Sequence, residues 1–182
     1  MIKKGDEILA VIIGGSRCGK TTLAIALVAM LWRRHRLRSI VFDPFKREHN
    51  WGKTAFVTDD LETFKRAVRG TKGCAVFWDE STTTLRKTNP EDIAFFTAIR
   101  HNHRAFFSIG HDFTVLSPMM RANLSDAYVF RQGENRPAQW SGLFADLDMM
   151  QTADLIQREF IHKQPFKKIV RQLPTLAELA AL

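Results

Sequence analysis

The sequence predicts an α/β fold in which a mostly parallel sheet of about five core strands carries helices on both faces. Apolar runs rich in Ile, Val and Phe alternate along the chain with longer helical patterns, which is typical of parallel strands joined by helical crossovers. Several runs are apolar at almost every position, as expected of strands covered on both faces. With 182 residues, of which 45% are hydrophobic and 25% charged, the chain is long enough for one globular domain with a substantial core.

The N-terminal part of the chain predicts a strand, a glycine-rich loop and a helix in succession. Ile8 to Gly15 (ILAVIIGG) is a short apolar run that ends in glycines, which fits a central parallel strand. Thr21 to Arg36 contains neither Gly nor Pro, and its last turn is basic. Cations near the C-terminal end of a helix interact favourably with the negative end of its dipole. We therefore expect a helix over Thr21 to Arg36.

A second strand and a short helix are expected next. Ser39 to Phe45 (SIVFDPF) is predicted as the second strand. Asp60 to Val68 carries its apolar residues at the spacing of one helix face. Either Asp59 or Asp60 is expected to cap this helix, because a carboxylate at that position accepts a hydrogen bond from a free backbone N–H.

The middle of the chain predicts two more buried strands on either side of a helix. Gly73 to Glu80 (GCAVFWDE) is the third predicted strand, and it ends on two carboxylates. Asn89 to His103 begins with Asn and Pro, which are favoured as N-cap and first helical residue. Ala105 to His111 (AFFSIGH) is the fourth predicted strand.

The pattern becomes less regular in the last third of the chain. The predicted elements are a short helix over Ser117 to Ser125, a fifth strand over Ala127 to Gln132, a helix over Asp146 to Phe160 and a terminal helix over Leu173 to Leu182. We therefore expect a single domain over residues 1–182, with a core over about residues 8–132 and a helical C-terminal extension over 133–182.

The chain is strongly basic, which favours polyanionic partners. It has 27 Lys and Arg against 19 Asp and Glu, a formal charge of +8. Part of the excess is gathered in Trp32 to Arg38, Arg100 to Arg104 and Lys163 to Arg171. For any one cluster, the alternative is that arginines at helix ends offset helix dipoles and keep the protein soluble.

Neither a membrane span nor a disulfide framework is expected. The longest uncharged run, Thr21 to Trp32, is shorter than the roughly 18 residues of a spanning helix, and no signal-peptide pattern precedes it. We therefore expect an intracellular protein without a transmembrane segment of its own. The two cysteines, Cys18 and Cys74, have neither metal-site spacing nor a disulfide pattern and are expected to be free thiols.

The strongest functional signal is a phosphate-binding loop. Gly14, four residues, then Gly19, Lys20 and Thr21 match GxxxxGK[ST] between a predicted strand and a predicted helix. The glycines let backbone N–H groups turn toward a β-phosphate, Lys20 is expected to reach the β- and γ-phosphates, and the Thr21 hydroxyl is placed to ligate Mg²⁺. The residues expected to hold the nucleotide, ATP, are Gly14, Gly15, Ser16, Arg17, Cys18, Gly19, Lys20, Thr21 and Thr22.

Two carboxylates at the end of the third predicted strand complete a hydrolytic site. The carboxyl ends of neighbouring parallel strands face one crevice, so Asp79 is expected beside Thr21, where it would hold Mg²⁺. Glu80 is expected to orient and deprotonate a water for attack on the γ-phosphate. Such a pair is typical of NTPases that hydrolyse for work and is less expected in small-molecule kinases, which exclude water.

Several stretches in order resemble the FtsK and HerA class of DNA-translocating P-loop ATPases, whose fold is also RecA-like. They are most similar to the compact genome-packaging ATPases of viruses with an internal membrane, such as the tectivirus type. The resemblance covers about Ile8 to Arg131. It is carried by GGSRCGKT, IVFDPF, FWDE, RHNHR with FFSIGH, and LSPMMRANLSDAYVFR.

The resemblance implies further site residues. His111 stands where the family usually has Gln or Asn as a sensor of the γ-phosphate; the alternative is that it caps the following turn. An arginine from a neighbouring subunit of the ring is expected to stabilise the transition state, with Arg121 favoured over Arg100 and Arg104; a plain surface arginine is the alternative. Asp43 either shapes the nucleotide crevice or forms the turn before Pro44.

The resemblance also implies partners. Such ATPases form homo-oligomeric rings, pentamers or hexamers, that thread double-stranded DNA without reading its sequence, and they act at the packaging vertex of a virion, against capsid or portal-vertex proteins, or in the host cytoplasm. Lys46 with Arg47, Arg86 with Lys87, or Arg100 to Arg104 would grip the phosphates. The alternatives are a phage-assembly or secretion ATPase acting at a membrane, a small nucleotide kinase, and a nucleotide-binding scaffold that does not hydrolyse.

Overall fold

An eight-stranded sheet runs through the part of the chain that the computed structural model describes, which comprises residues 7–81, 90–111, 121–133, 135–165, 167 and 170–172. The strand order is β3-β2-β4-β5-β1-β6-β7-β8. The strands are β1 (Ile8–Ile13), β2 (Ser39–Phe42), β3 (Ala55–Thr58), β4 (Ala75–Trp78), β5 (Ala105–Gly110), β6 (Asp126–Phe130), β7 (Phe160–Lys163) and β8 (Val170–Gln172). The helices are α1 (Lys20–His35), α2 (Leu61–Gly70), α4 (Pro90–Asn102), α6 (Arg136–Phe144) and the 3₁₀ helix η2 (Leu147–Ala153).

The sheet is parallel from β3 to β6 and antiparallel at β7 and β8. All five strands predicted from the sequence are present as β1, β2, β4, β5 and β6. Since β1 lies between β5 and β6, and β4 follows β5, the carboxyl ends of β4, β5 and β1 meet at one edge of the sheet. That edge carries the candidate site.

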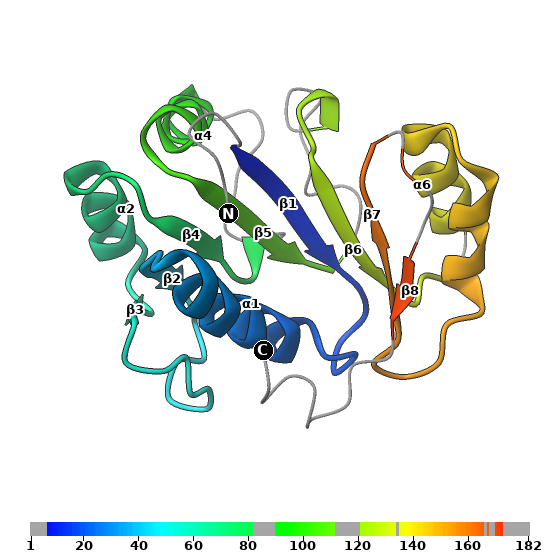
Figure 1. The fold of residues 1–182 in the computed structure, drawn as a ribbon, viewed down its shortest axis with the longest axis horizontal. Coiled ribbons are helices and arrows are strands. Elements are labelled where there is room, and N and C mark those ends of the chain that lie inside the picture. The colour runs from blue at the N-terminus through cyan, green and yellow to red at the C-terminus, as the bar shows by residue number, and fades with distance from the viewer. Residues whose placement is uncertain are drawn as a thin grey trace.

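Helices cover both faces of the sheet, as the sequence predicts, and α1 crosses in front of it in Figure 1. Alternate residues of β1 enter opposite cores, because neighbouring side chains of a strand point to opposite faces. Ala10 and Ile12 pack with α1, whereas Val11 and Ile13 belong to the core formed with α2, α4 and α6. The central strands are therefore buried on both sides.

Local capping defines where the helices begin and end. At α2 the N-cap is Asp60, whose carboxylate accepts a hydrogen bond from the Thr63 backbone N–H at 2.7 Å; of the two candidates, this one is confirmed. The last turn of α1 is basic, and Arg36 ends the helix in a left-handed conformation. Both arrangements satisfy groups that a helix terminus leaves without partners.

An aromatic cluster fills the core under α2 and α4. The ring of Phe64, which is fully buried, lies 5.7 Å from Phe42, 5.3 Å from Trp78 and 6.1 Å from Phe95, measured between ring centroids. Tilted and edge-on aromatic pairs at these separations add to the free energy gained by burying the rings. The cluster joins β2 and β4, the strands that carry Asp43 and Asp79 at their ends.

The prediction of a helix over Asp146 to Phe160 is wrong. A 3₁₀ helix ends at Ala153, and Phe160 begins β7. The strand pairs with β6, which would otherwise leave its backbone groups at an open sheet edge. The expected C-terminal extension is therefore only partly helical, because β7 and β8 join the same sheet.

Other differences are local. Strand β3 and helix α6 were not among the predicted elements. Strand β2 ends at Phe42, before the predicted end, because Asp43 starts a turn. The terminal helix expected over Leu173 to Leu182 lies outside the described residues, as do all but residues 121–125 of the helix expected over Ser117 to Ser125.

A polar cluster ties β7 to β6. The carboxylate of Asp126 accepts hydrogen bonds from Ser125 and Gln164 at 2.9 and 2.8 Å, and it pairs with Nε2 of His162 at 2.8 Å. Burial alone would raise the pKa of Asp126, but the hydrogen bonds, led by that of His162, hold this pKa below its ordinary value. The His162 ring also stacks on Tyr128, with 4.4 Å between ring centroids.

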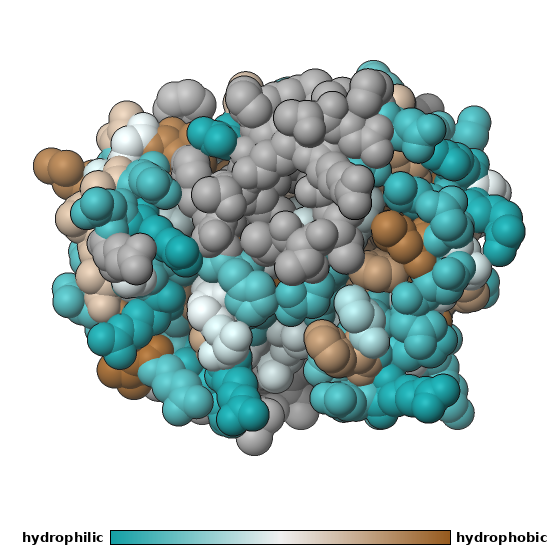
Figure 2. Space-filling model, turned by 180° about the vertical axis from the view of Figure 1, so that it is seen from behind, coloured by the Kyte–Doolittle hydropathy of each residue, from teal (hydrophilic) through white to brown (hydrophobic). Residues whose placement is uncertain are grey.

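Figure 2 shows the face of the molecule behind the view of Figure 1, where hydrophilic side chains cover most of the described surface. Among the residues whose burial is described, the exposed large apolar side chains are Phe45, Phe56, Leu147, Met150 and Ile156. Among the described residues, no helix combines the length and apolar character needed to cross a bilayer. Cys18 and Cys74 are free thiols, as predicted.

Candidate active site

The loop between β1 and α1 has the geometry of a phosphate cradle. It is fixed at its start by a hydrogen bond from the Gly14 N–H to the carbonyl of Gly110 in β5, at 3.2 Å, and at its end by the bond from Leu23 N–H to Gly19 O, at 2.9 Å. The Lys20 side chain is buried, and its Nζ donates to the carbonyl of Gly15 at 2.8 Å. The ammonium group is therefore held over the loop, beside the N-terminus of α1, where the helix dipole favours anions.

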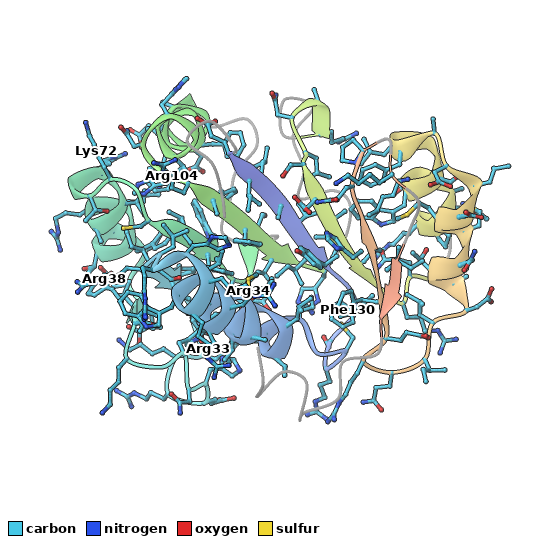
Figure 3. The ribbon with its side chains drawn as sticks, viewed as in Figure 1. Arg33, Arg34, Arg38, Lys72, Arg104 and Phe130 are labelled. Atoms are coloured by element: carbon cyan, nitrogen blue, oxygen red, sulfur yellow. The ribbon has the colours of Figure 1, made fainter. Side chains whose placement is uncertain are left out.

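Two glycines of this loop cannot be replaced without strain. A Cβ atom on Gly14 would lie 2.6 Å from Cβ of Phe130 and 2.7 Å from Sγ of Cys18. Gly19 has a φ of 107°, a conformation that favours glycine. Figure 3 shows Phe130 at the end of β6, beside the loop that joins β1 to α1. Strand β6 thus packs directly against the loop, and at position 14 only glycine leaves room for the Phe130 side chain.

The structure brings Asp79 to Thr21, as the sequence predicts. Asp79 follows β4, its backbone N–H donates to Phe42 O at 3.0 Å, and its Oδ2 accepts a hydrogen bond from the Thr21 hydroxyl at 3.3 Å. Burial raises the pKa of Asp79 to about 6, and the negative charges of Asp43 and Glu80 add to this effect. A buried carboxylate among other carboxylates is electrostatically unfavourable unless a cation is near.

The chemistry of this pair fits Mg²⁺. A hydroxyl and a carboxylate oxygen are hard ligands, and Mg²⁺ is usually bound through one or two protein groups, with phosphate and water oxygens completing its shell. Among the described residues no cluster of three or more His, Cys, Asp or Glu side chains could hold a metal alone. Thr21 and Asp79 would therefore hold the ion together with a nucleotide.

Glu80 and His111 form a second pair at the same edge. Glu80 has a left-handed backbone with a φ of 50°, and its N–H donates to Oδ1 of Asp79 at 2.8 Å. Nε2 of His111 lies 3.2 Å from both carboxylate oxygens of Glu80. The adjacent Ser81 hydroxyl donates to Ile109 O at 2.5 Å, which fixes the segment after β4 against β5. The two side chains are thus held by neighbouring strands.

Glu80, His111 and much of the loop line one open cleft of about 410 Å³, whereas Asp79 contacts it through Thr21. Its lining residues are Ser16, Arg17, Gly19, Lys20, Thr21, Thr22, Phe45, Glu48, His49, Glu80, His111 and Arg158. Of the nine loop residues predicted to hold nucleotide, six line the cleft and Gly14, Gly15 and Cys18 do not. Gly14 and Cys18 lie against each other and against β6, and the Gly15 carbonyl accepts the hydrogen bond from Lys20. Burial raises the pKa of Cys18, so its thiol is neutral at physiological pH.

Asp43 has both of the roles considered for it. Its Oδ1 accepts a hydrogen bond from the Phe45 N–H at 2.8 Å, which forms the turn, and its Oδ2 contacts Nδ1 of His49 and Nε1 of Trp51, each at 2.7 Å. Since Phe45 and His49 line the cleft, the fully buried carboxylate of Asp43 also positions one wall of the site.

Of the candidate arginines whose side chains the structure describes, neither Arg121 nor Arg104 lines the cleft of its own chain. Arg121 lines a separate hollow of about 740 Å³ with Asp146 and Asp148. Arg104 lies where β5 begins, at the opposite edge of the sheet, in Figure 3. Arg100 lies in α4, but its side chain is outside the described part of the structure. The described arginines that line the cleft are Arg17 and Arg158, and neither was a candidate for this role.

The sequence missed four residues of the cleft wall: Phe45, Glu48, His49 and Arg158. The first three follow the Asp-Pro turn after β2, so their proximity to the predicted loop is a consequence of strand order. Arg158 comes from the segment before β7, and no local pattern indicates it.

No protein-family model matches the chain, and no curated protein sequence matches it. Solved structures do match. The genome packaging NTPase B204 of Sulfolobus turreted icosahedral virus 2, in complex with AMPPCP, is 17% identical with a TM-score of 0.75; the match covers 96% of this chain and 100% of that one. VirB4 of Thermoanaerobacter pseudethanolicus is 10% identical with a TM-score of 0.66, over 94% of this chain and 90% of that one.

A third match is the pCW3 conjugation coupling protein TcpA with ATPγS. It is 13% identical with a TM-score of 0.65, over 92% of this chain and 60% of that one. At such identities the likeness establishes the fold. The chain therefore has the α/β fold of these nucleotide-binding proteins, which confirms the fold class that the resemblance implied.

Proposed function

We propose that this chain hydrolyses ATP and uses the free energy to move double-stranded DNA, as a viral genome-packaging motor. The observation that carries the proposal is that Lys20, Thr21 and Glu80 line one cleft, with the Asp79 carboxylate hydrogen-bonded to both the Thr21 hydroxyl and the Glu80 N–H. These residues supply a cation for phosphates, two oxygen ligands for Mg²⁺ and a carboxylate for water. The fold shared with packaging and conjugation ATPases supports the same class of activity.

Binding uses the loop between β1 and α1. Backbone N–H groups of the loop and of the N-terminus of α1 donate hydrogen bonds to the β-phosphate. The Lys20 ammonium exchanges its hydrogen bond to Gly15 for bonds to the β- and γ-phosphate oxygens. The Thr21 hydroxyl and the Asp79 carboxylate would hold Mg²⁺, which would supply positive charge to offset that of the phosphates.

Hydrolysis uses the pair of Glu80 and His111. Glu80 orients a water and takes its proton as the water oxygen attacks the γ-phosphorus and ADP leaves. The Nε2–H of His111 cannot donate a full-strength hydrogen bond to Glu80 and to a phosphate at the same time. A hydrogen bond from His111 to the γ-phosphate would therefore weaken its hydrogen bond to Glu80, which links the two groups. This extends the sensor role that the resemblance implied for His111.

The DNA part of the proposal is supported by charge. Arg38, Lys72 and Arg104 lie at the edge of the sheet where β2, β4 and β5 begin (Figure 3). Their segments are adjacent, since the Ala75 N–H donates to Arg38 O and the Arg104 N–H to Cys74 O, each at 2.9 Å. Of the loop candidates, Lys46 is already paired with Asp59 at 2.6 Å, and Arg86 with Lys87 lies outside the described residues.

The motor would be a homo-oligomeric ring of five or six subunits that docks on capsid or portal-vertex proteins. Each cleft would then lie at a subunit interface, where an arginine of the next subunit, with Arg121 the favoured candidate, stabilises the charge of the transition state.

The test is ATP turnover of the oligomeric protein with and without duplex DNA. We expect duplex DNA of any sequence to raise turnover, and added salt to remove the effect steeply, since binding depends on phosphate charge. Lys20→Ala should abolish turnover, whereas Arg38→Ala combined with Lys72→Ala should retain basal turnover and lose stimulation. Stimulation by single-stranded DNA alone would favour the assembly or conjugation alternative, and phosphate transfer to a nucleoside without release would favour a kinase.

A further inference from the structure

Arg158 is a cation in the nucleotide cleft to which none of the motifs assigns a role. It lies in the segment between η2 and β7, its side chain is exposed, and it lines the cleft together with the phosphate loop. A Cβ atom on Gly19 would lie 3.7 Å from Cγ of Arg158 and 3.9 Å from its Cα. Both its backbone and its side chain therefore lie against the loop.

The segment that carries Arg158 is anchored on both sides. Leu155 and Phe160 are buried. The Glu159 carboxylate accepts a hydrogen bond from the Ile156 N–H, and the Glu159 backbone N–H donates one to the Ile156 carbonyl, each at 3.1 Å. The Phe160 ring lies 5.3 Å from that of Phe130, the residue that presses on the loop (Figure 3). Arg158 is thus held in place relative to the phosphate loop.

The backbone of Arg158 is strained, with a φ of 69°. Five described residues other than glycine have positive φ values. Arg36 and Ala145 are helix C-caps, where this conformation is ordinary. The other three, Arg17, Glu80 and Arg158, all line the cleft. Since glycine would adopt this conformation at no steric cost, an arginine kept there indicates a use for its side chain.

The guanidinium of Arg158 is available to a ligand. Within the described residues, no carboxylate forms an ion pair with it and no side chain or carbonyl accepts a hydrogen bond from it. Arg158 lies on the opposite side of the loop from Glu80 and His111 along the strand order. Glu80 and His111 follow β4 and β5, the loop follows β1, and Arg158 precedes β7, on the other side of β1 and β6.

We propose that Arg158 binds the nucleoside-monophosphate end of the nucleotide: the α-phosphate and the sugar and base attached to it. This rests on the proposed function, which places the γ-phosphate beside Glu80 and His111. The remainder of the nucleotide then extends across the loop toward β7. A guanidinium donates paired hydrogen bonds to phosphate oxygens and stacks on flat rings, so it suits this end of the molecule.

The test is titration of the full-length chain with ATP and with ADP. Arg158→Ala should weaken both by the same factor, roughly 10-fold or more, since hydrogen bonds to charged groups are among the strong ones, and kcat at saturating ATP should stay unchanged. Arg158→Lys should weaken the binding of ATP and ADP less than Arg158→Ala does. Arg34→Ala, at the other end of α1 (Figure 3), is the matched control and should bind both nucleotides as the wild type does.

A further variant separates binding from folding. Arg158→Gly relieves the positive φ, so it should unfold at the same temperature as the wild type or higher, yet bind nucleotide as weakly as Arg158→Ala. Wild-type affinity in Arg158→Ala would overturn the inference, and so would a fall in kcat with unchanged Kd. If the wild type itself bound no nucleotide, the proposed function would fail instead.

Discussion

Substituting alanine for Gly14 tests how closely strand β6 packs against the phosphate loop. The new Cβ atom would lie 2.6 Å from Cβ of Phe130, an atom that cannot move without its backbone, and 2.7 Å from Sγ of Cys18. Contacts this close force the loop or β6 to shift. Overpacking of this kind typically costs about 1–3 kcal/mol. In a chain of this size each kcal/mol lowers the Tm by about 2–4 °C, so we expect a decrease of roughly 2–12 °C.

Gly15→Ala is the matched control, because a Cβ atom on Gly15 has no neighbour within 4 Å. Its Tm should stay the same or rise slightly, since alanine restricts the unfolded chain. Thermal unfolding of both variants without nucleotide is the assay. Adding Cys18→Ala to Gly14→Ala should rescue only part of the loss, because the contact with Phe130 remains. If Gly14→Ala were as stable as Gly15→Ala, the packing described here would be incorrect.

Three further predictions concern the stability of the fold. Phe64→Ala should lower the free energy of unfolding by about 3–5 kcal/mol, because the ring is fully buried in the aromatic cluster; a loss under about 1 kcal/mol in urea denaturation would contradict this. Asp60→Ala should cost about 1 kcal/mol through loss of the N-cap of α2, whereas Asp59→Ala should cost less by the same assay. Asp126→Asn should be less stable than the wild type at neutral pH. Because the pKa of Asp126 is lowered in the folded state, the difference should be fully present above the ordinary value of about 3.9 and disappear as the pH falls through the lowered one; equal urea stability of the two proteins at pH 7 would refute it.

The sequence was sufficient to predict the parts of the site that depend on local pattern. The spacing of Gly14, Gly19, Lys20 and Thr21 identifies a phosphate loop, because few other arrangements place glycines and a lysine between a strand and a helix. Asp79 could be placed beside Thr21 for a related reason: a buried parallel strand delivers the residue after it to the same edge of the sheet.

The remainder of the site depends on contacts between distant parts of the chain. Arg158 lies against the loop because β7 pairs with β6, whereas the sequence pattern predicted a helix over Asp146 to Phe160 that includes Arg158 and ends at the first residue of β7. The contact between Glu80 and His111 joins residues 31 positions apart on two strands. Asp43 showed a turn signal, but its hydrogen bonds to His49 and Trp51 follow from how the next loop folds back.

The central claim is that Glu80 activates water on a nucleotide held by the loop, and single-turnover hydrolysis by Glu80→Gln tests it most directly. The variant should bind ATP with nearly wild-type affinity, because Lys20, Thr21 and Asp79 are unchanged. Its rate of phosphate release should fall by about 10²-fold or more, the usual contribution of a general base. Glu62→Gln, the same change on the exposed side of α2, should behave as the wild type. A Glu80→Gln variant that releases phosphate at the wild-type rate would contradict the account.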